Sequence, residues 1–241
     1  MLEPAGEVAD VYGRRVVSLM ESKVEDRETP VLAALLLDLD GTLVDSVLLH
    51  AVAWWRAFDE AGIQVSTATI QPLIGMGGPE LLQRVIGHDD PGLRKAHGRF
   101  FEPMRSWVRP LPGAAELLAR AGQEGIRRYV VTSSNPADAE ALIALLPDDA
   151  IDGVVHGDEV ASTKPAPDLY QLALARWNLE PDTTVAVGDS EWDVRAGGRA
   201  GVRSLGLLTG GTPAQTLFEA GAVAVFPSCR ELVRAWAGRH R

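Results

Sequence analysis

Short apolar runs alternate with helical stretches along most of this chain, and this alternation constrains its fold more than any other feature. Continuous apolar runs of this length are typical of parallel strands that are covered on both faces. Strands are expected at residues 32–37, 128–132, 154–155, 184–187, 203–208 and 222–225, and helices between them at 114–123, 137–146, 167–177 and 194–200. The sequence therefore predicts an α/β fold with an open, doubly wound, Rossmann-like parallel sheet.

One connection is too long for a simple crossover. Between Leu43 and Pro110 the sequence offers helical patterns, such as 47–61 and 80–86, but no convincing strand. An ordinary crossover needs only about a dozen residues. We therefore expect residues 46–108 to form an inserted helical cap, and residues 31–45 and 109–241 to form the catalytic core. Residues 1–30 have a weak helical pattern with no surface to cover it, so we expect a disordered N-terminal extension, with Met20 as an alternative start.

Polar side chains follow three of the predicted strands. Asp38 and Asp40 follow the first strand, Thr132 and Ser133 end the second, and Asp189 follows a later one. Ligands of doubly wound sheets collect at the carboxyl ends of the strands, so these side chains should lie at one edge. Carboxylates held that close repel one another unless a cation lies among them, and oxygen ligands without histidine or cysteine favour Mg²⁺.

The same edge has the groups that a phosphate site requires. Lys164, in Ser-Thr-Lys-Pro, would supply the positive charge that binds a phosphoryl group. A carboxylate beside Mg²⁺ and this lysine can attack phosphorus and form an aspartyl phosphate. A second carboxyl two residues later can protonate the leaving alcohol and then take a proton from water. The alternative for an isolated Asp-x-Asp is a turn or helix cap.

Four stretches, DLDGT, VVTSS, TKP and GDSEWD, resemble in order and strand context the four motifs of the haloacid dehalogenase-like hydrolase superfamily. The resemblance spans residues 32–228. It implies that Asp38 is the nucleophile and Asp40 the general acid/base, with phosphate binding by Thr132, Ser133 and Lys164. It also implies Mg²⁺ binding by Asp38, the Asp40 carbonyl and Asp189, with Asp193 supporting the metal or orienting the lysine. Because true dehalogenases lack an acid at the Asp40 position, the resemblance favours phosphatases.

The insert follows the first motif directly, as in phosphoglycolate phosphatase-like and β-phosphoglucomutase-like members. His50 and Trp54 share one helix face and resemble the start of the mutase cap, although a place in the cap core or a hinge hydrogen bond would also explain them. Gly75 and Gly77 belong to a flexible cap loop, since no strand precedes them and the third glycine of a dinucleotide loop is missing. The mutases carry a basic loop here, whereas residues 73–79 are uncharged. A phosphosugar mutase is therefore the alternative to a phosphatase, and a phosphorylated signalling receiver is disfavoured by the insert.

Composition excludes other classes of protein. The 23 basic and 33 acidic residues give a net charge of −10, which argues against a surface built for nucleic acid or anionic lipid. No apolar run approaches the ~18 residues of a membrane span. A single cysteine, Cys229, suits a reducing compartment. We expect a cytoplasmic monomer or homodimer whose partner is a small-molecule phosphomonoester. The basic side chains of the cap form no tight cluster in the sequence, although one or two could face that substrate.

Overall fold

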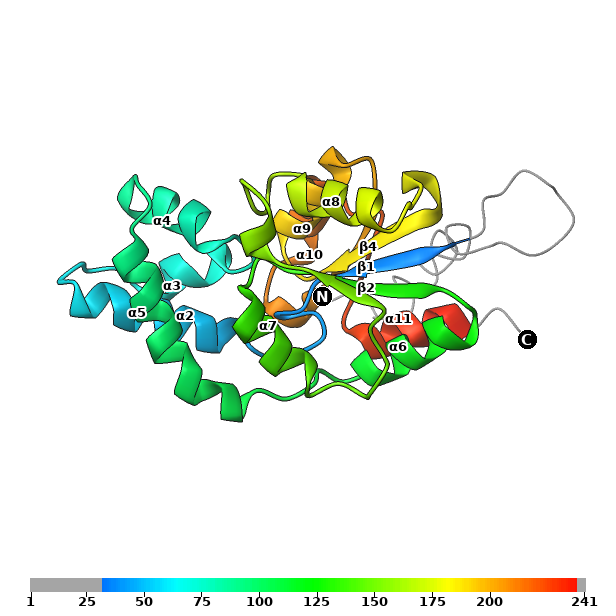
Figure 1. The fold of residues 1–241 in the computed structure, drawn as a ribbon, viewed down its shortest axis with the longest axis horizontal. Helices are drawn as coiled ribbons and strands as arrows, with labels where there is room; N and C mark the ends of the chain where they lie inside the picture. The colour runs from blue at the N-terminus through cyan, green and yellow to red at the C-terminus, as the bar shows by residue number, and fades with distance from the viewer. Residues whose placement is uncertain (1–31, 238–241) are drawn as a thin grey trace, which may run out of the picture.

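A six-stranded parallel sheet forms the centre of the molecule (Figure 1). The structure, a computed structural model, describes residues 32–237, so the predicted N-terminal extension lies outside the described residues. The strands are β1 (Ala34–Leu37), β2 (Arg127–Val131), β3 (Gly153–Val155), β4 (Thr184–Gly188), β5 (Arg203–Leu207) and β6 (Ala224–Phe226). Their order is β3-β2-β1-β4-β5-β6, and each neighbouring pair is parallel. The predicted doubly wound α/β class is confirmed.

The predicted strands are all present, with boundaries shifted by one or two residues. The first begins at Ala34 instead of residue 32. Leu208, predicted as the end of a strand, begins the short 3₁₀ helix η5 (Leu208–Gly210). The last strand begins at Ala224 because Gly221, with a positive φ of 111°, ends the preceding helix and a short turn follows it.

Helices cover both faces of the sheet. On one face lie α6 (Ala114–Gln123), α7 (Pro136–Ile143) and α11 (Cys229–Ala237); on the other lie α8 (Asp168–Arg176) and α9 (Glu191–Arg199), with α10 (Ala214–Ala220) beside α9. Successive residues of β1 alternate between these layers. Leu35 and Leu37 pack with α6 and α7, whereas Leu36 packs with α8. This explains why the strand sequence is apolar throughout.

Helix α9 begins earlier than the apolar pattern predicted. The predicted helix began at residue 194, but the structure starts it at Glu191, directly after Ser190. The Ser190 hydroxyl accepts a hydrogen bond from the Asp193 backbone N–H, and the Asp193 carboxylate accepts one in return from the Ser190 N–H. This reciprocal capping fixes the first turn of the helix at the end of β4.

Residues 46–108 fold into a helical unit beside the sheet, at the left of Figure 1. It contains α2 (Val47–Glu60), α3 (Thr67–Ile70), η1 (Gln71–Leu73), α4 (Gly78–Ile86), α5 (Pro91–Phe101) and η2 (Glu102–Trp107). Phe58, Ile70, Leu82 and Leu93 belong to an apolar core of its own. Because this segment has its own core and no strand, we propose residues 46–108 as a cap and the remainder of the described chain as the core.

Candidate active site

The strand order brings the predicted polar side chains together. Since β1 lies between β2 and β4, the residues that follow these strands share one edge of the sheet. Asp38 follows β1, Thr132 follows β2 and Asp189 follows β4, and all three are buried. A sharp turn at Gly41, with φ of +80°, then takes the chain away from β1. A Cβ at Gly41 would lie 2.4 Å from Asp189 Oδ2, so glycine is needed for this close approach.

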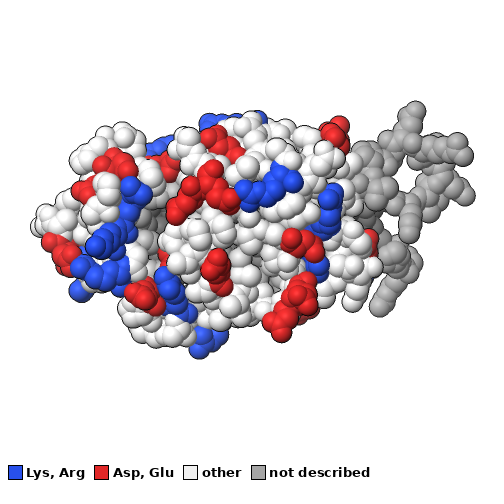
Figure 2. Space-filling view, in the orientation of Figure 1, with Lys and Arg blue, Asp and Glu red and all other residues white. Residues whose placement is uncertain are grey.

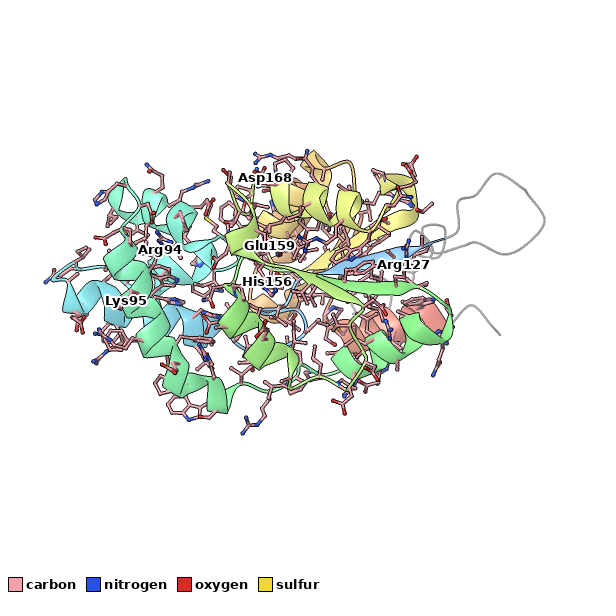
Figure 3. All side chains as sticks on the ribbon, in the orientation of Figure 1. Arg94, Lys95, Arg127, His156, Glu159 and Asp168 are labelled. Carbon is pink, nitrogen blue, oxygen red and sulfur yellow. The ribbon has the colours of Figure 1, made fainter. Side chains whose placement is uncertain are left out.

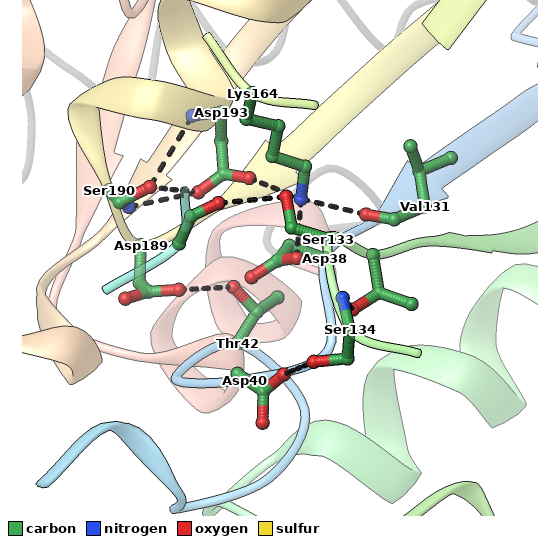
Figure 4. Close-up of polar contacts among 12 residues, drawn as sticks. Asp38, Asp40, Thr42, Val131, Ser133, Ser134, Lys164, Asp189, Ser190 and Asp193 are labelled. Atoms are coloured by element: carbon green, nitrogen blue, oxygen red, sulfur yellow. Dashed lines mark hydrogen bonds and ion pairs between the residues drawn. The ribbon is translucent and has the colours of Figure 1, made fainter. Parts of the chain in front are cut away.

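Lys164 is the centre of the buried charge at this edge (Figure 4). Its Nζ lies 2.5 Å from Asp38 Oδ1 and 2.7 Å from Asp193 Oδ1, and it donates to the Val131 carbonyl at 2.7 Å. Burial by itself lowers the pKa of Lys164, but the carboxylates of Asp193 and Asp38 raise it well above its ordinary value. The lysine is therefore held as a cation, and Asp193 orients it directly.

Three carboxylates converge beside this lysine. Asp38, Asp189 and Asp193 each offer one oxygen, and these oxygens lie within 4.8 Å of one another. The pKa of Asp38 is raised to about 7, chiefly by burial and then by Asp193, although Lys164 opposes the shift. Burial, followed by the charge of Asp38, raises the pKa of Asp189 well above its ordinary range. One lysine thus leaves the negative charge of the cluster incompletely compensated.

This cluster fits a hard divalent cation. Asp38 Oδ2 is buried and has no hydrogen-bond partner among the described residues. Asp189 Oδ1 accepts a bond of 2.9 Å from the Thr42 hydroxyl, which fixes the orientation of that carboxylate. A buried, unpaired carboxylate oxygen is costly unless something compensates it, and an all-oxygen donor set suits Mg²⁺. The carboxylates of Asp38 and Asp189 therefore fit a bound Mg²⁺, and these two residues, with the Asp40 carbonyl, stay our predicted metal ligands.

Asp40 occupies a different environment from Asp38. Its carboxylate accepts hydrogen bonds from Ser46 Oγ at 2.5 Å and Ser134 Oγ at 2.8 Å, and it lies 3.1 Å from His50 Nε2. Burial favours the neutral acid, but the charge and hydrogen bond of His50 and the two hydroxyls outweigh it and lower the pKa of Asp40 to about 2. The two acids thus have pKa values shifted in opposite directions, as expected for groups with different roles.

The two predicted cap residues lie in one aromatic cluster at this site. The His50 ring stacks on Phe101 with a centroid distance of 3.8 Å, and Trp54 stacks on His97 at 4.4 Å. His50 Nδ1 lies 3.1 Å from His97 Nε2. Burial, and then the neighbouring His50, lowers the pKa of His97 well below its ordinary value. His50 therefore serves both as a partner of Asp40 and as part of the aromatic packing.

The glycine loop of the cap is held against the core. The Gly77 N–H donates to Thr163 Oγ1 at 2.8 Å, and Glu80 accepts from the Thr163 N–H at 2.7 Å and from its hydroxyl at 2.8 Å. The predicted phosphate ligand Ser133 donates its hydroxyl to the Gly75 carbonyl at 3.0 Å. Thr163 directly precedes Lys164, so the cap docks next to the buried lysine.

A cavity of about 310 Å³ lies between cap and core. Its lining includes eight residues that the sequence identified, namely Asp38, Asp40, His50, Trp54, Gly75, Gly77, Thr132 and Ser133. Lys164, Asp189 and Asp193 lie outside this lining. The structure adds lining residues that sequence reasoning missed, among them Glu80, His97, Ser134 and Asp138, and it brings Arg94 there as well. The motif that contains Ser134 could have identified that residue, whereas the others depend on how the cap docks.

No helix among residues 32–237 is long and apolar enough to cross a membrane. On the face drawn in Figure 2, basic side chains gather over the cap with acidic ones beside them.

Comparisons with known proteins agree with this geometry. CbbY from Cereibacter sphaeroides is 32% identical over 192 residues, which cover 73% of this chain and 84% of that protein. Phosphoglycolate phosphatase from Rhodospirillum rubrum is 31% identical over 210 residues, with coverage of 80% and 86%. The crystal structure of a hydrolase from Pseudomonas syringae superposes with a TM-score of 0.80 at 30% identity, covering 87% of this chain and all of that one. The family model for haloacid dehalogenase-like hydrolases matches residues 32–201, and the chain belongs to this family.

Proposed function

We propose that this enzyme is a Mg²⁺-dependent phosphatase that hydrolyses a small phosphorylated metabolite through an aspartyl phosphate on Asp38. The observation that carries the proposal is the contact between the buried Lys164 and Asp38, which lines the cavity together with Asp40. The size of the cavity favours a small substrate, such as a sugar phosphate, a polyol phosphate or phosphoglycolate. A relative named phosphoglycolate phosphatase supports the same class of reaction.

In this proposal Asp38 attacks phosphorus, and the bond between phosphorus and the leaving oxygen breaks. Lys164 holds Asp38 through its ion pair and provides positive charge beside the transferring phosphoryl group. Asp193 keeps the lysine in place. Thr132 Oγ1 already accepts a hydrogen bond from the Ser134 N–H at 3.0 Å, so its hydroxyl proton can be donated to a phosphoryl oxygen. When bound by Asp38 and Asp189, Mg²⁺ would neutralise negative charge on the phosphoryl oxygens.

Asp40 acts as the general acid and base. With a pKa near 2 it is ionised at neutral pH, and this form takes a proton from the water that hydrolyses the aspartyl phosphate. The first step requires the protonated acid. A phosphate dianion placed beside Asp40 raises its pKa, because like charges disfavour ionisation, and thereby promotes protonation when substrate binds. His50, Ser46 and Ser134 orient the carboxylate for both steps.

A pre-steady-state experiment separates the two acids. In Asp40→Asn, p-nitrophenyl phosphate should still phosphorylate Asp38, because nitrophenol leaves without much help from an acid. The second step should stall, and a burst approaching one equivalent of nitrophenol should precede very slow turnover. Alkyl phosphates should lose about 10²–10⁴-fold in rate. Asp38→Asn should give no burst with any substrate.

The assignment fails if Asp38→Asn gives a burst. It also fails if Asp40→Asn lowers the rate equally for aryl and alkyl substrates while metal binding, measured by calorimetry, is retained.

A single buried cysteine is consistent with the cytoplasm as the site of this activity, and a monomer or homodimer remains our expectation for the assembly.

A further inference from the structure

Arg94 lies in the cavity lining even though the glycine loop beside it carries no basic residue. It belongs to α5, and Figure 3 labels it there together with its neighbour Lys95. Among the described residues that line the cavity, Arg94 is the sole arginine or lysine, since Lys164 lies behind the lining. The cap therefore supplies one positive charge to the part of the cavity that it covers.

The glycine loop makes room for this arginine. An ideal Cβ at Gly78 would lie 3.0 Å from Arg94 Cδ and 3.1 Å from its Cγ, and 3.4 Å from Trp54. A larger residue at 78 would therefore push the arginine stem aside. Glycine at this position lets the stem of Arg94 cross the loop next to the aromatic wall of the cavity.

The guanidinium of Arg94 is engaged by a carboxylate that an incoming anion can replace. Arg94 pairs with Asp89, at 3.0 Å from Nε to Oδ1 and 3.1 Å from Nη2 to Oδ2, and both side chains are about 40% exposed. Ion pairs at such exposure contribute little to stability. Asp89 is not part of the cavity lining. An anionic ligand group can thus take the place of Asp89 at low cost.

Two of the acids that line the cavity already have partners of their own, so they do not pair with Arg94. Glu80 accepts two hydrogen bonds from Thr163. Asp138 forms an ion pair with Arg105 and accepts a hydrogen bond from the Asn135 side chain. Asp158 also lines the cavity but is exposed to solvent, which screens its charge.

We propose that Arg94 binds a second anionic group of the substrate, a carboxylate or a phosphate, at the end remote from the phosphoryl group that Asp38 attacks. The proposal rests on the phosphatase function proposed above and narrows it to substrates with two anionic ends. An arginine forms paired hydrogen bonds with either group, so the two share one recognition chemistry.

The test compares substrates that differ in their remote end. Phosphoglycolate carries a carboxylate, a pentulose 1,5-bisphosphate carries a phosphate, and fructose 1-phosphate and p-nitrophenyl phosphate carry neither. Arg94→Gln should lower kcat/KM about 10- to 100-fold for at least one of the two doubly anionic substrates, chiefly by raising KM. It should change the other two less than about two-fold. Lys95→Gln is the matched control, since it removes the same charge from the adjacent position of α5, outside the lining.

A second variant tests whether Asp89 competes with the substrate for Arg94. Asp89→Asn removes the competing carboxylate, so kcat/KM for the preferred doubly anionic substrate should rise or stay the same. The proposal is overturned if Arg94→Gln lowers kcat/KM equally for all four substrates or for none of them. It is also overturned if Lys95→Gln causes the same loss, or if Asp89→Asn lowers kcat/KM for the doubly anionic substrates.

A measurement of substrate affinity tests the role of Arg94 independently of turnover. Absence of phosphate release from every substrate, p-nitrophenyl phosphate included, would count against the proposed phosphatase and not against Arg94. Calorimetric titration of phosphoglycolate and of the bisphosphate into Asp38→Asn, with and without Arg94→Gln, should then show at least a tenfold weaker affinity for one of them when the arginine is absent. Equal affinities would refute the role of Arg94.

Discussion

Replacing Gly77 with alanine should separate the cap from the core. The backbone at Gly77 has φ of −70° and ψ of 163°, an extended conformation that alanine adopts without strain. The obstacle is contact, because a Cβ there would lie 2.2 Å from Thr163 Oγ1 and 2.7 Å from Glu80 Oε2. Ordinary contacts are near 3.5 Å. The loop must therefore move by roughly 1 Å, which disrupts the hydrogen bonds that Thr163 makes with Gly77 and Glu80.

The magnitude follows from those bonds. A neutral hydrogen bond contributes about 0.5–1.5 kcal/mol and one to a charged group about 1.5–3 kcal/mol. Because the site is partly exposed and the bonds act as a unit, we expect the variant to destabilise the docked cap by about 2–4 kcal/mol in total. If catalysis requires that state, kcat/KM falls about 30- to 1,000-fold. Steady-state kinetics with p-nitrophenyl phosphate measures this loss.

The cap offers a matched control. Gly98 lies within α5, and a Cβ there would meet nothing within 4 Å. Gly98→Ala should keep full activity and stabilise the protein by about 0.5–1 kcal/mol, seen as a higher melting temperature. Glu80→Ala removes part of the same contact without a clash, so the Gly77→Ala/Glu80→Ala double variant should lose little more than Gly77→Ala alone. Normal activity in Gly77→Ala, or additive losses in the double variant, would show that this contact does not control catalysis.

Two further predictions concern the metal. EDTA should abolish phosphate release and Mg²⁺ should restore it, while Asp189→Asn should remain nearly inactive at any Mg²⁺ concentration; full turnover in metal-free protein would refute the site. In metal-free protein the Asp38 carboxyl has a pKa of about 7, raised chiefly by burial and then by Asp193, so protons compete with the cation below that pH. The Mg²⁺ affinity measured by calorimetry should therefore increase as the pH rises from about 5.5 to 7, and the raised pKa of Asp189 acts in the same direction; an affinity independent of pH across this range would contradict the assignment.

The sheet and the core part of the site could be predicted because their signals are local. A buried strand is apolar along its length, and Asp38, Thr132 and Asp189 follow such strands directly. Parallel pairing of the strands then brings these residues to one edge of the sheet, independently of the conformation of the loops that connect the strands. Strand ends were less predictable, since the apolar pattern continues for a residue or two past the last ladder bond, as at Leu208.

The cap part of the site depends on contacts that no local pattern encodes. Glu80 and Thr163 are 83 residues apart in the chain, and their pairing exists because the cap docks over the core. Arg94 and His97 lie on α5, which the sequence reading did not identify, although Asp90 caps it and Pro91 occupies its first position. That signal marks the start of the helix but not the face that meets the cavity.

The contrast between Asp38 and Asp40 shows how the cap enters the chemistry. Leu39, between them, is fully buried in the core, and the two acids are surrounded by different elements. The partner of Asp38, Lys164, comes from the core, and so does Asp193, which pairs with that lysine. Two of the three groups on Asp40, Ser46 and His50, lie instead where the chain enters the cap. A movement of α2 would therefore change the environment of the proposed acid/base and leave the contacts of the nucleophile intact, so cap docking can control proton transfer separately from phosphoryl transfer.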